Sequence, residues 1–230
     1  MNFKIINLFL LAFIFVACGN EQAKQGTNKA SKNTAPTEQK AKTKKEKTIL
    51  FFGNSLTAAY GLDPSKGFVS LIQQRLDSLG LPYRAVNAGL SGETTAGGKE
   101  RLAWVLRQPV DIFVLELGGN DGLRGIEPAS SFENLDAIIT AVKTKYPQAK
   151  IILAGMEAPP NMGERFTSQF REMYPKLAKK HGTALIPFFL ENIAGIPELN
   201  QKDRVHPNEK GQLILVENVW RVLGGLLEEG

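Results

Sequence analysis

Short apolar runs alternate with amphipathic stretches from residue 48 to the C-terminus. Apolar runs of about four to eight residues bounded by turn-forming residues are typical of buried strands in a parallel sheet. The stretches between them repeat apolar residues every three or four positions, as helices do when one face is buried. The pattern predicts strands at residues 49–52, 83–87, 111–117, 150–154 and 183–187, separated by helices through residues 68–79, 102–106, 132–142 and 166–177.

A last helix is predicted near the C-terminus. Proline is favoured in the first turn of a helix, so the dipeptide His206-Pro207 is expected to begin it. Apolar residues at helical spacing follow, and they are expected to form the inward face of this helix: Leu213, Val216, Trp220 and Leu223.

The alternation of strands and helices predicts an α/β fold, in which a five-stranded, parallel, doubly wound sheet is covered by helices on both faces. Right-handed crossovers place the carboxyl ends of all strands at one edge of the sheet, and ligands bind beyond that edge. Polar or glycine-rich segments that can converge there lie at residues 53–55, 89–92, 118–120 and 203–206.

The positive charge of the chain belongs to its N-terminal part. The whole chain has 28 basic and 23 acidic residues, a formal net charge of +5. Residues 1–47 hold nine basic and three acidic residues, which leaves 19 basic and 20 acidic residues in 48–230. The part expected to fold is therefore nearly neutral, and this argues against a nucleic-acid-binding protein.

Residues 1–18 have the organisation of a secretory signal. Lys4 precedes a core at residues 5–17 that is apolar except for one asparagine and too short to cross a bilayer as a helix. Cys18 follows directly, and the junction resembles a bacterial lipobox, although Phe15 stands where Leu, Val or Ile is usual. We expect cleavage before Cys18, a lipid on its sulfur, and a lipid-anchored protein of the cell envelope, periplasmic or in the outer membrane. The alternative is an ordinary signal peptide with an incidental cysteine.

Residues 19–47 are expected to form a flexible, Lys-rich linker to a single domain at residues 48–230. The segment Gly19–Lys47 has no aromatic residue and no periodicity, so it cannot bury enough apolar surface to offset the entropy of ordering. Its lysines are either solvated or in contact with anionic headgroups. Cys18 is the only cysteine, which excludes a disulfide within the chain.

Ser55, His206 and Asp203 are the candidates for nucleophilic catalysis. Ser55 follows the first strand, at the edge where ligands bind. A serine hydroxyl needs a base, and His206 has a carboxylate three residues away that can accept from Nδ1–H and leave Nε2 free. Taken alone, Ser55 and Asp203 are equally consistent with helix or loop caps. The other histidine, His181, precedes a glycine at a helix end, where it interacts with the helix dipole.

Three groups can donate to an oxyanion: the backbone N–H of Ser55, the backbone N–H of Gly92 and the side-chain amide of Asn120. Glycine allows the backbone to approach a ligand closely. Gly92 and Asn120 are also ordinary turn residues, so their type alone does not assign them to a site.

Four segments in chain order resemble the blocks of the SGNH (GDSL) hydrolases, and residues 115–125 resemble the thioesterase-I-type arylesterases and lysophospholipases among them. The segments are residues 53–56, 87–94, 118–121 and 203–207, so the resemblance extends over essentially all of 48–230. It implies a three-layer, flavodoxin-like sandwich with strand order 2-1-3-4-5. It also implies Ser55 as nucleophile, His206 as base and Asp203 as the residue that orients it.

The resemblance further implies that Gly92 and Asn120 complete the oxyanion hole with the Ser55 N–H, with Gly89 as second choice for the glycine. The loop 123–128, beginning at Leu123, would border the acyl pocket, and Asp121 would support it.

Asn54 departs from the family pattern, which usually has Asp before the serine. We expect Asn54 to hold the loop by hydrogen bonds and to take no part in proton transfer, so activity should survive. Glu116, at the end of a buried strand, is expected to anchor the glycine loop through backbone N–H groups; the alternative is simple contact with solvent.

The predicted function is therefore hydrolysis of carboxylic esters, with aryl or short-chain acyl esters, lysophospholipids and acyl thioesters as possible substrates. An acyltransferase or a carbohydrate deacetylase on the same scaffold stays open, and a non-catalytic binding lipoprotein is the alternative from another class. Gly-x-Ser-x-Gly and phosphate-loop patterns do not occur. With two histidines and one cysteine, no metal site and no cofactor are expected, and the protein is expected to be a monomer.

Overall fold

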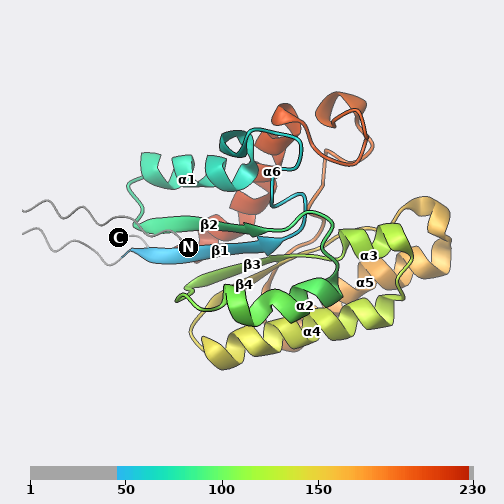
Figure 1. The fold of residues 1–230 in the computed structure, drawn as a ribbon, viewed down its shortest axis with the longest axis horizontal. Coiled ribbons are helices and arrows are strands. Elements are labelled where there is room, and N and C mark those ends of the chain that lie inside the picture. The colour runs from blue at the N-terminus through green and yellow to red at the C-terminus, as the bar shows by residue number, and fades with distance from the viewer. Residues whose placement is uncertain (1–45, 228–230) are drawn as a thin grey trace, which may run out of the picture. The chain divides into compact units, whose positions relative to one another are not determined.

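The computed structural model describes residues 46–227, and the predicted signal at 1–18, Cys18 and nearly all of the predicted linker lie outside them. Five parallel strands form one sheet in the order β2-β1-β3-β4-β5, which confirms the predicted topology (Figure 1). The strands are β1 (Lys47–Gly53), β2 (Tyr83–Gly89), β3 (Ile112–Glu116), β4 (Lys150–Ala154) and β5 (Ala184–Ile186). The first strand begins at Lys47, the last residue of the predicted linker.

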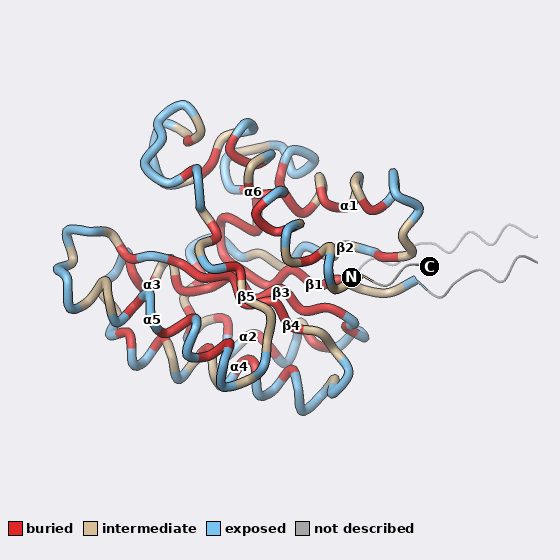
Figure 2. Tube along the Cα trace, turned by 180° about the vertical axis from the view of Figure 1, so that it is seen from behind, coloured by how far each residue is buried: buried red, intermediate tan, exposed pale blue. Residues whose placement is uncertain are grey.

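Helices cover both faces of the sheet, as the predicted three-layer fold requires. In Figure 1, α1 (Phe68–Ser78) and α6 (Glu209–Leu223) lie on one face, and α2 (Thr95–Val105), α4 (Pro128–Lys145) and α5 (Glu164–His181) lie on the other. The strands between these layers are mostly buried, and the helices bury one side each (Figure 2). Among the described residues, none of the helices has the length and apolar character needed to cross a bilayer.

Strand β1 lies between β2 and β3 in the sheet. Its residues 49–53 are buried, and its last residue, Gly53, lies in register with Gly89 of β2 and with Glu116 of β3. The carboxyl ends of three neighbouring strands are therefore level. The loops that follow them begin side by side, and these loops carry most of the predicted site residues.

The short helix α3 (Gly119–Arg124) is not predicted by the hydropathy pattern. It starts after Gly118 and ends at Gly125, both of which have positive φ angles, 115° and 65°. The sequence Gly118-Gly119-Asn120-Asp121-Gly122 is rich in glycine, which is typical of a loop. The buried Asp121 carboxylate accepts hydrogen bonds from Thr95 and Ser131, and these bonds hold the helix in place in spite of its composition.

The prediction for the start of the last helix is wrong by two to three residues. Helix α6 begins at Glu209, because Asn208 caps it by accepting from the N–H groups of Lys210 and Gly211. Pro207 instead forms an isolated antiparallel bridge with Asn200.

The inward face of α6 also differs from the prediction at one position. Val216 and Leu223 are buried as expected and Trp220 is half-buried, but Leu213 is 59% exposed. The polar residue Gln212 occupies the inward position because its Oε1 accepts from the Phe68 N–H at 2.9 Å. A hydropathy pattern does not reveal such a bond.

Candidate active site

Ser55 lies in a tight turn directly after β1 and is 8% exposed. The turn is closed by hydrogen bonds from the Ala58 N–H to the Asn54 carbonyl and from the Tyr60 N–H to the Ser55 carbonyl. A side chain at Gly53 would collide with the Thr57 hydroxyl and the Glu116 carboxylate. Glycine at the end of β1 therefore allows the Ser55 turn to pack directly against β3.

The structure brings Ser55, His206 and Asp203 into one chain of hydrogen bonds, although Ser55 and His206 are 151 positions apart. Ser55 Oγ is 2.9 Å from His206 Nε2, and His206 Nδ1 is 2.7 Å from Asp203 Oδ2. A carboxylate can only accept, so the imidazole proton belongs on Nδ1, and Nε2 is left to accept from the serine hydroxyl.

Asp203 is held as a carboxylate by donors from its own loop. Partial burial opposes its ionisation, but hydrogen bonds from the His206 N–H, the His206 ring and the Val205 N–H outweigh that effect and lower its pKa to about 2. The carboxylate therefore stays charged across the neutral range and can stabilise a protonated His206.

The loop that carries His206 is joined to the segment that follows Ser55. Gln201 Nε2 donates to the Tyr60 carbonyl at 2.7 Å, and the Gln201 N–H donates to the His206 carbonyl at 2.7 Å. The Tyr60 ring lies 4.7 Å from the His206 ring. Gln201 and Tyr60 were not predicted from the sequence, because they are 141 positions apart and only the fold brings them into contact.

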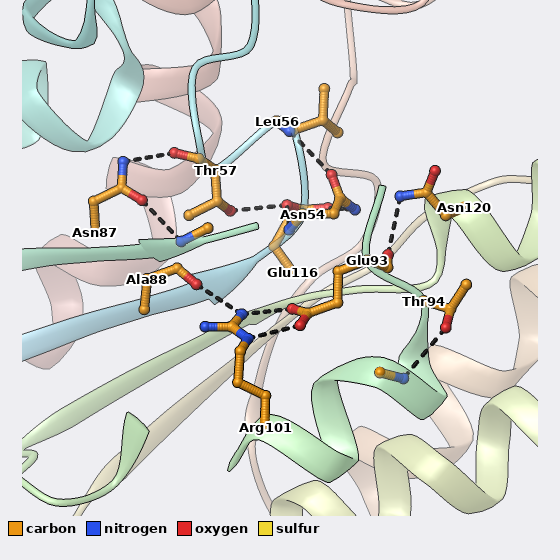
Figure 3. Close-up of polar contacts among 12 residues, drawn as sticks. Asn54, Leu56, Thr57, Asn87, Ala88, Glu93, Thr94, Arg101, Glu116 and Asn120 are labelled. Atoms are coloured by element: carbon orange, nitrogen blue, oxygen red, sulfur yellow. Dashed lines mark hydrogen bonds and ion pairs between the residues drawn. The ribbon is translucent and has the colours of Figure 1, made fainter. Parts of the chain in front are cut away.

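Asn54 and Glu116 form a buried network under the Ser55 turn (Figure 3). Asn54 Nδ2 donates to Glu116 Oε1 at 2.7 Å, and Asn54 Oδ1 accepts from the Leu56 N–H at 3.0 Å. Glu116 Oε2 accepts from the Asn54 N–H and from the Thr57 hydroxyl. With 1% of its surface exposed, Glu116 has no simple contact with solvent, and it anchors the Ser55 turn and not, as predicted, the glycine loop. Burial raises the pKa of Glu116 to about 7, although these hydrogen bonds favour the charged form.

Asn120 lines the cavity that contains Ser55 and His206, and its Nδ2 donates to the Glu93 carbonyl at 2.9 Å. Gly92 lies in the adjoining loop with a φ of +80°, a conformation that favours glycine, but it is not among the cavity-lining residues. Gly89 is needed for packing, since a side chain there would collide with the backbone of Thr57 and Ala58.

Asp121 does not line the cavity. It is buried and accepts from the Thr95 N–H, the Thr95 hydroxyl and the Ser131 hydroxyl, which fixes α3 to the first turns of α2 and α4. His181, at the end of α5, lies 2.7 Å from Asp136 and is far from Ser55 in the fold.

The cavity beside Ser55 has a volume of about 400 Å³. Leu123 lines it, as the resemblance implied. The charged residues Glu157 and Arg204 also line it. Several further apolar residues line the cavity and were not predicted from the sequence. Their positions in the loops after β4 and β5 or beside His206 were the available signal: Met156, Ala158, Phe188, Leu190, Ala194 and Val205.

Comparison with known proteins gives one family. Residues 51–214 match the model of the GDSL-like lipase/acylhydrolase family. Esterase TesA of Pseudomonas aeruginosa is 45% identical over 181 residues, which are 78% of this chain and 89% of the relative. Thioesterase 1/protease 1/lysophospholipase L1 of Escherichia coli K12 is 37% identical over 171 residues, covering 74% of this chain and 80% of the relative.

The likeness extends to three dimensions. A crystal structure of TesA superimposes with a TM-score of 0.75 at 44% identity, covering 79% of this chain and 100% of the other. Residues 51–214, which match the family model, include the loops at the carboxyl edge of the sheet, where the site described above lies. The chain therefore belongs to the GDSL-like lipase/acylhydrolase family, the SGNH hydrolases, and is a carboxylic ester hydrolase.

Proposed function

We propose that the chain is a serine esterase that cleaves short-chain acyl esters, with Ser55 as nucleophile, His206 as general base and Asp203 as its orienting carboxylate. The observation that carries this proposal is the pair of short contacts, 2.9 Å from Ser55 Oγ to His206 Nε2 and 2.7 Å from His206 Nδ1 to Asp203. A serine hydroxyl is activated when it lies within hydrogen-bond distance of a base and that base lies within hydrogen-bond distance of the group that orients it.

In the acylation step, Ser55 Oγ attacks the ester carbonyl carbon while its proton passes to His206 Nε2. The carbonyl oxygen becomes an oxyanion, which accepts from the backbone N–H groups of Ser55 and Gly92 and from the Asn120 amide. Collapse of the tetrahedral intermediate breaks the bond to the leaving alcohol, which takes the proton from His206. A water molecule then repeats the sequence on the acyl-enzyme and releases the carboxylic acid.

The cavity and the relatives support a substrate class. A cavity of about 400 Å³ with apolar walls suits one short to medium acyl chain. The named activities of the relatives, esterase, thioesterase and lysophospholipase, support carboxylic esters, acyl thioesters and lysophospholipids as substrates.

The proposed envelope location rests on residues 1–18 alone. We propose that Cys18 carries a lipid, so full-length protein made in bacteria fed a labelled fatty acid should incorporate the label, and Cys18→Ser should not. Equal labelling of both proteins would contradict the lipid anchor and leave the esterase proposal untouched.

The test of the catalytic assignment is Ser55→Ala in the full-length protein. We expect kcat for 4-nitrophenyl butyrate to fall roughly 10⁴-fold or more, because no other hydroxyl lies at His206 Nε2 in this network. Ser168→Ala, which removes a half-buried serine hydroxyl on α5, is the matched control and should keep wild-type kcat. Wild-type turnover by Ser55→Ala would show that the nucleophile is another group.

A further inference from the structure

A buried ion pair lies beside the proposed oxyanion hole. Glu93 follows Gly92 directly, and its carboxylate accepts from two nitrogens of Arg101 on α2, with Nε at 2.7 Å and Nη2 at 2.5 Å (Figure 3). The side chains are 3% and 20% exposed. Two parallel bonds between a guanidinium and a carboxylate fix their mutual orientation as well as their distance.

Arg101 also holds the start of the same loop. Its Nη2 donates to the Ala88 carbonyl at 3.0 Å, and its guanidinium lies 4.4 Å from the centre of the Phe52 ring in β1. The loop that carries Gly92 is therefore joined at both ends to one side chain of α2. That side chain packs in turn on the strand that leads to Ser55.

Glu93 fixes the second proposed donor as well. A carbonyl oxygen only accepts, so the Glu93 carbonyl requires that the nitrogen of the Asn120 amide, not its oxygen, faces the loop at 2.9 Å. That nitrogen keeps a second N–H. The peptide between Gly92 and Glu93 is held too, by Arg124 Nη2 at the Gly92 carbonyl and by the Leu90 carbonyl at the Glu93 N–H. None of these bonds uses the Gly92 N–H.

We propose that the Glu93–Arg101 ion pair positions the oxyanion hole. Glu93 holds Gly92 because the two residues share a peptide bond, and it holds Asn120 because the Glu93 carbonyl accepts from the Asn120 amide. The proposal rests on the esterase function proposed above. Neither Glu93 nor Arg101 touches the substrate in this role. Both act by keeping the Gly92 N–H and the Asn120 amide aimed at the place where negative charge develops.

Positioning predicts a specific kinetic effect. Loss of a single oxyanion donor lowers kcat by roughly 10²–10³-fold, and a displacement of about 1 Å costs on the order of 10²-fold. Arg101→Lys keeps the charge but loses the planar fork that matches the carboxylate. We therefore expect Arg101→Lys to lower kcat for 4-nitrophenyl butyrate by roughly 10–100-fold, with KM within about twofold of wild type.

The chain offers a matched control remote from the site. Arg75 pairs with Glu217 at 2.7 Å and lies 4.3 Å from the Trp220 ring, between α1 and α6. It therefore has a carboxylate partner and an aromatic partner, as Arg101 has. Arg75→Lys should keep wild-type kcat, so a loss confined to Arg101→Lys is an effect on the site.

A transition-state analogue separates positioning from general loosening of the fold. A trifluoromethyl ketone forms a tetrahedral adduct with the serine and places an oxyanion in the hole, whereas the methyl ketone of equal length does not. In Arg101→Lys we expect the Ki of the fluorinated ketone to rise by about the factor by which kcat falls. The affinity for the methyl ketone should not change.

The double variant Glu93→Leu/Arg101→Met keeps the test decisive if a single variant fails to fold. It removes both charges together, so no unpaired buried charge remains. We expect a folded protein with the same loss of kcat as Arg101→Lys. Wild-type kcat and fluorinated-ketone affinity in either folded variant would overturn the inference. If that happened while Ser55→Ala was inactive, the proposed function would stand and only the positioning role would fall.

Discussion

Asn54 illustrates at the scale of one residue how a site can keep its geometry with a different side chain. Its amide donates to Glu116 and accepts from the Leu56 N–H, so both halves of the group are used. An aspartate could keep the second bond, but it would place a carboxylate against the Glu116 carboxylate. Two carboxyl groups in contact can be accommodated when they share one proton.

We expect Asn54→Asp to keep kcat/KM for 4-nitrophenyl butyrate within roughly tenfold of wild type, since the contact that shapes the Ser55 turn is retained. The pH dependence of the variant should differ from that of wild type, because the introduced carboxyl group and Glu116 titrate as a coupled pair, whereas in wild type Glu116 titrates beside an amide. The measurement is the pH profile of kcat/KM for both proteins. A folded Asn54→Asp protein with no activity would indicate that the Asn54 amide takes part in the reaction.

At the scale of an element, the start of α6 depends on a residue next to the site. Asn208 Oδ1 accepts from the first turn of the helix, while its Nδ2 donates to the carbonyls of Glu198 and Asn200. One side chain thus joins the helix to the loop that precedes His206. The sequence pattern predicts the helix in the right region, but it favours Pro207 as the start because the capping bonds depend on this loop.

Asn208→Ala should lower the free energy of unfolding by about 1–2 kcal/mol, as expected for loss of a helix cap. Asn208→Asp keeps an acceptor at the helix start, where negative charge is favourable, and loses only the donors to the loop. Its loss of stability in urea unfolding should be smaller than that of the alanine variant. Equal stability of Asn208→Ala and wild type would show that the cap contributes nothing.

At the scale of the whole molecule, the alternation of strands and helices, together with the family resemblance, was sufficient to predict the strand order and the edge at which the site forms. It was also sufficient to predict that Ser55 lies near His206, because both residues are in loops at that edge. The bond of Gln212 to Phe68 and the pair Glu93–Arg101 could not be predicted. They depend on the angle at which helices pack on the sheet, and no local pattern encodes that angle.

The free energy of unfolding of the domain should depend on pH because Glu116 is buried. Its pKa of about 7 in the folded protein lies above the ordinary value of 4.5. Between these values the folded protein binds more protons than the unfolded one, so stability falls as pH rises. A tenfold change in an acid constant corresponds to about 1.4 kcal/mol, which gives a loss of up to about 3 kcal/mol.

The measurement is the free energy of unfolding of wild type minus that of Glu116→Gln, from pH 5 to pH 8. This difference should decrease with pH, since glutamine does not titrate. Asp203 acts in the opposite direction, because its pKa is lowered: its contribution is present above about pH 4 and is lost toward pH 2. A difference that stays constant from pH 5 to pH 8 would contradict the assignment to Glu116.

The interior position of β1, between two other strands, has a consequence for the internal motions of the domain. Its amides are bonded between β2 and β3, so they should exchange with deuterium only when the entire domain opens. The segment 201–206 is largely exposed and forms no strand or helix, so its amides should exchange through local fluctuations. We therefore expect the Ser55 side chain to be held more rigidly than the His206 imidazole, which is the group proposed to accept and return the proton.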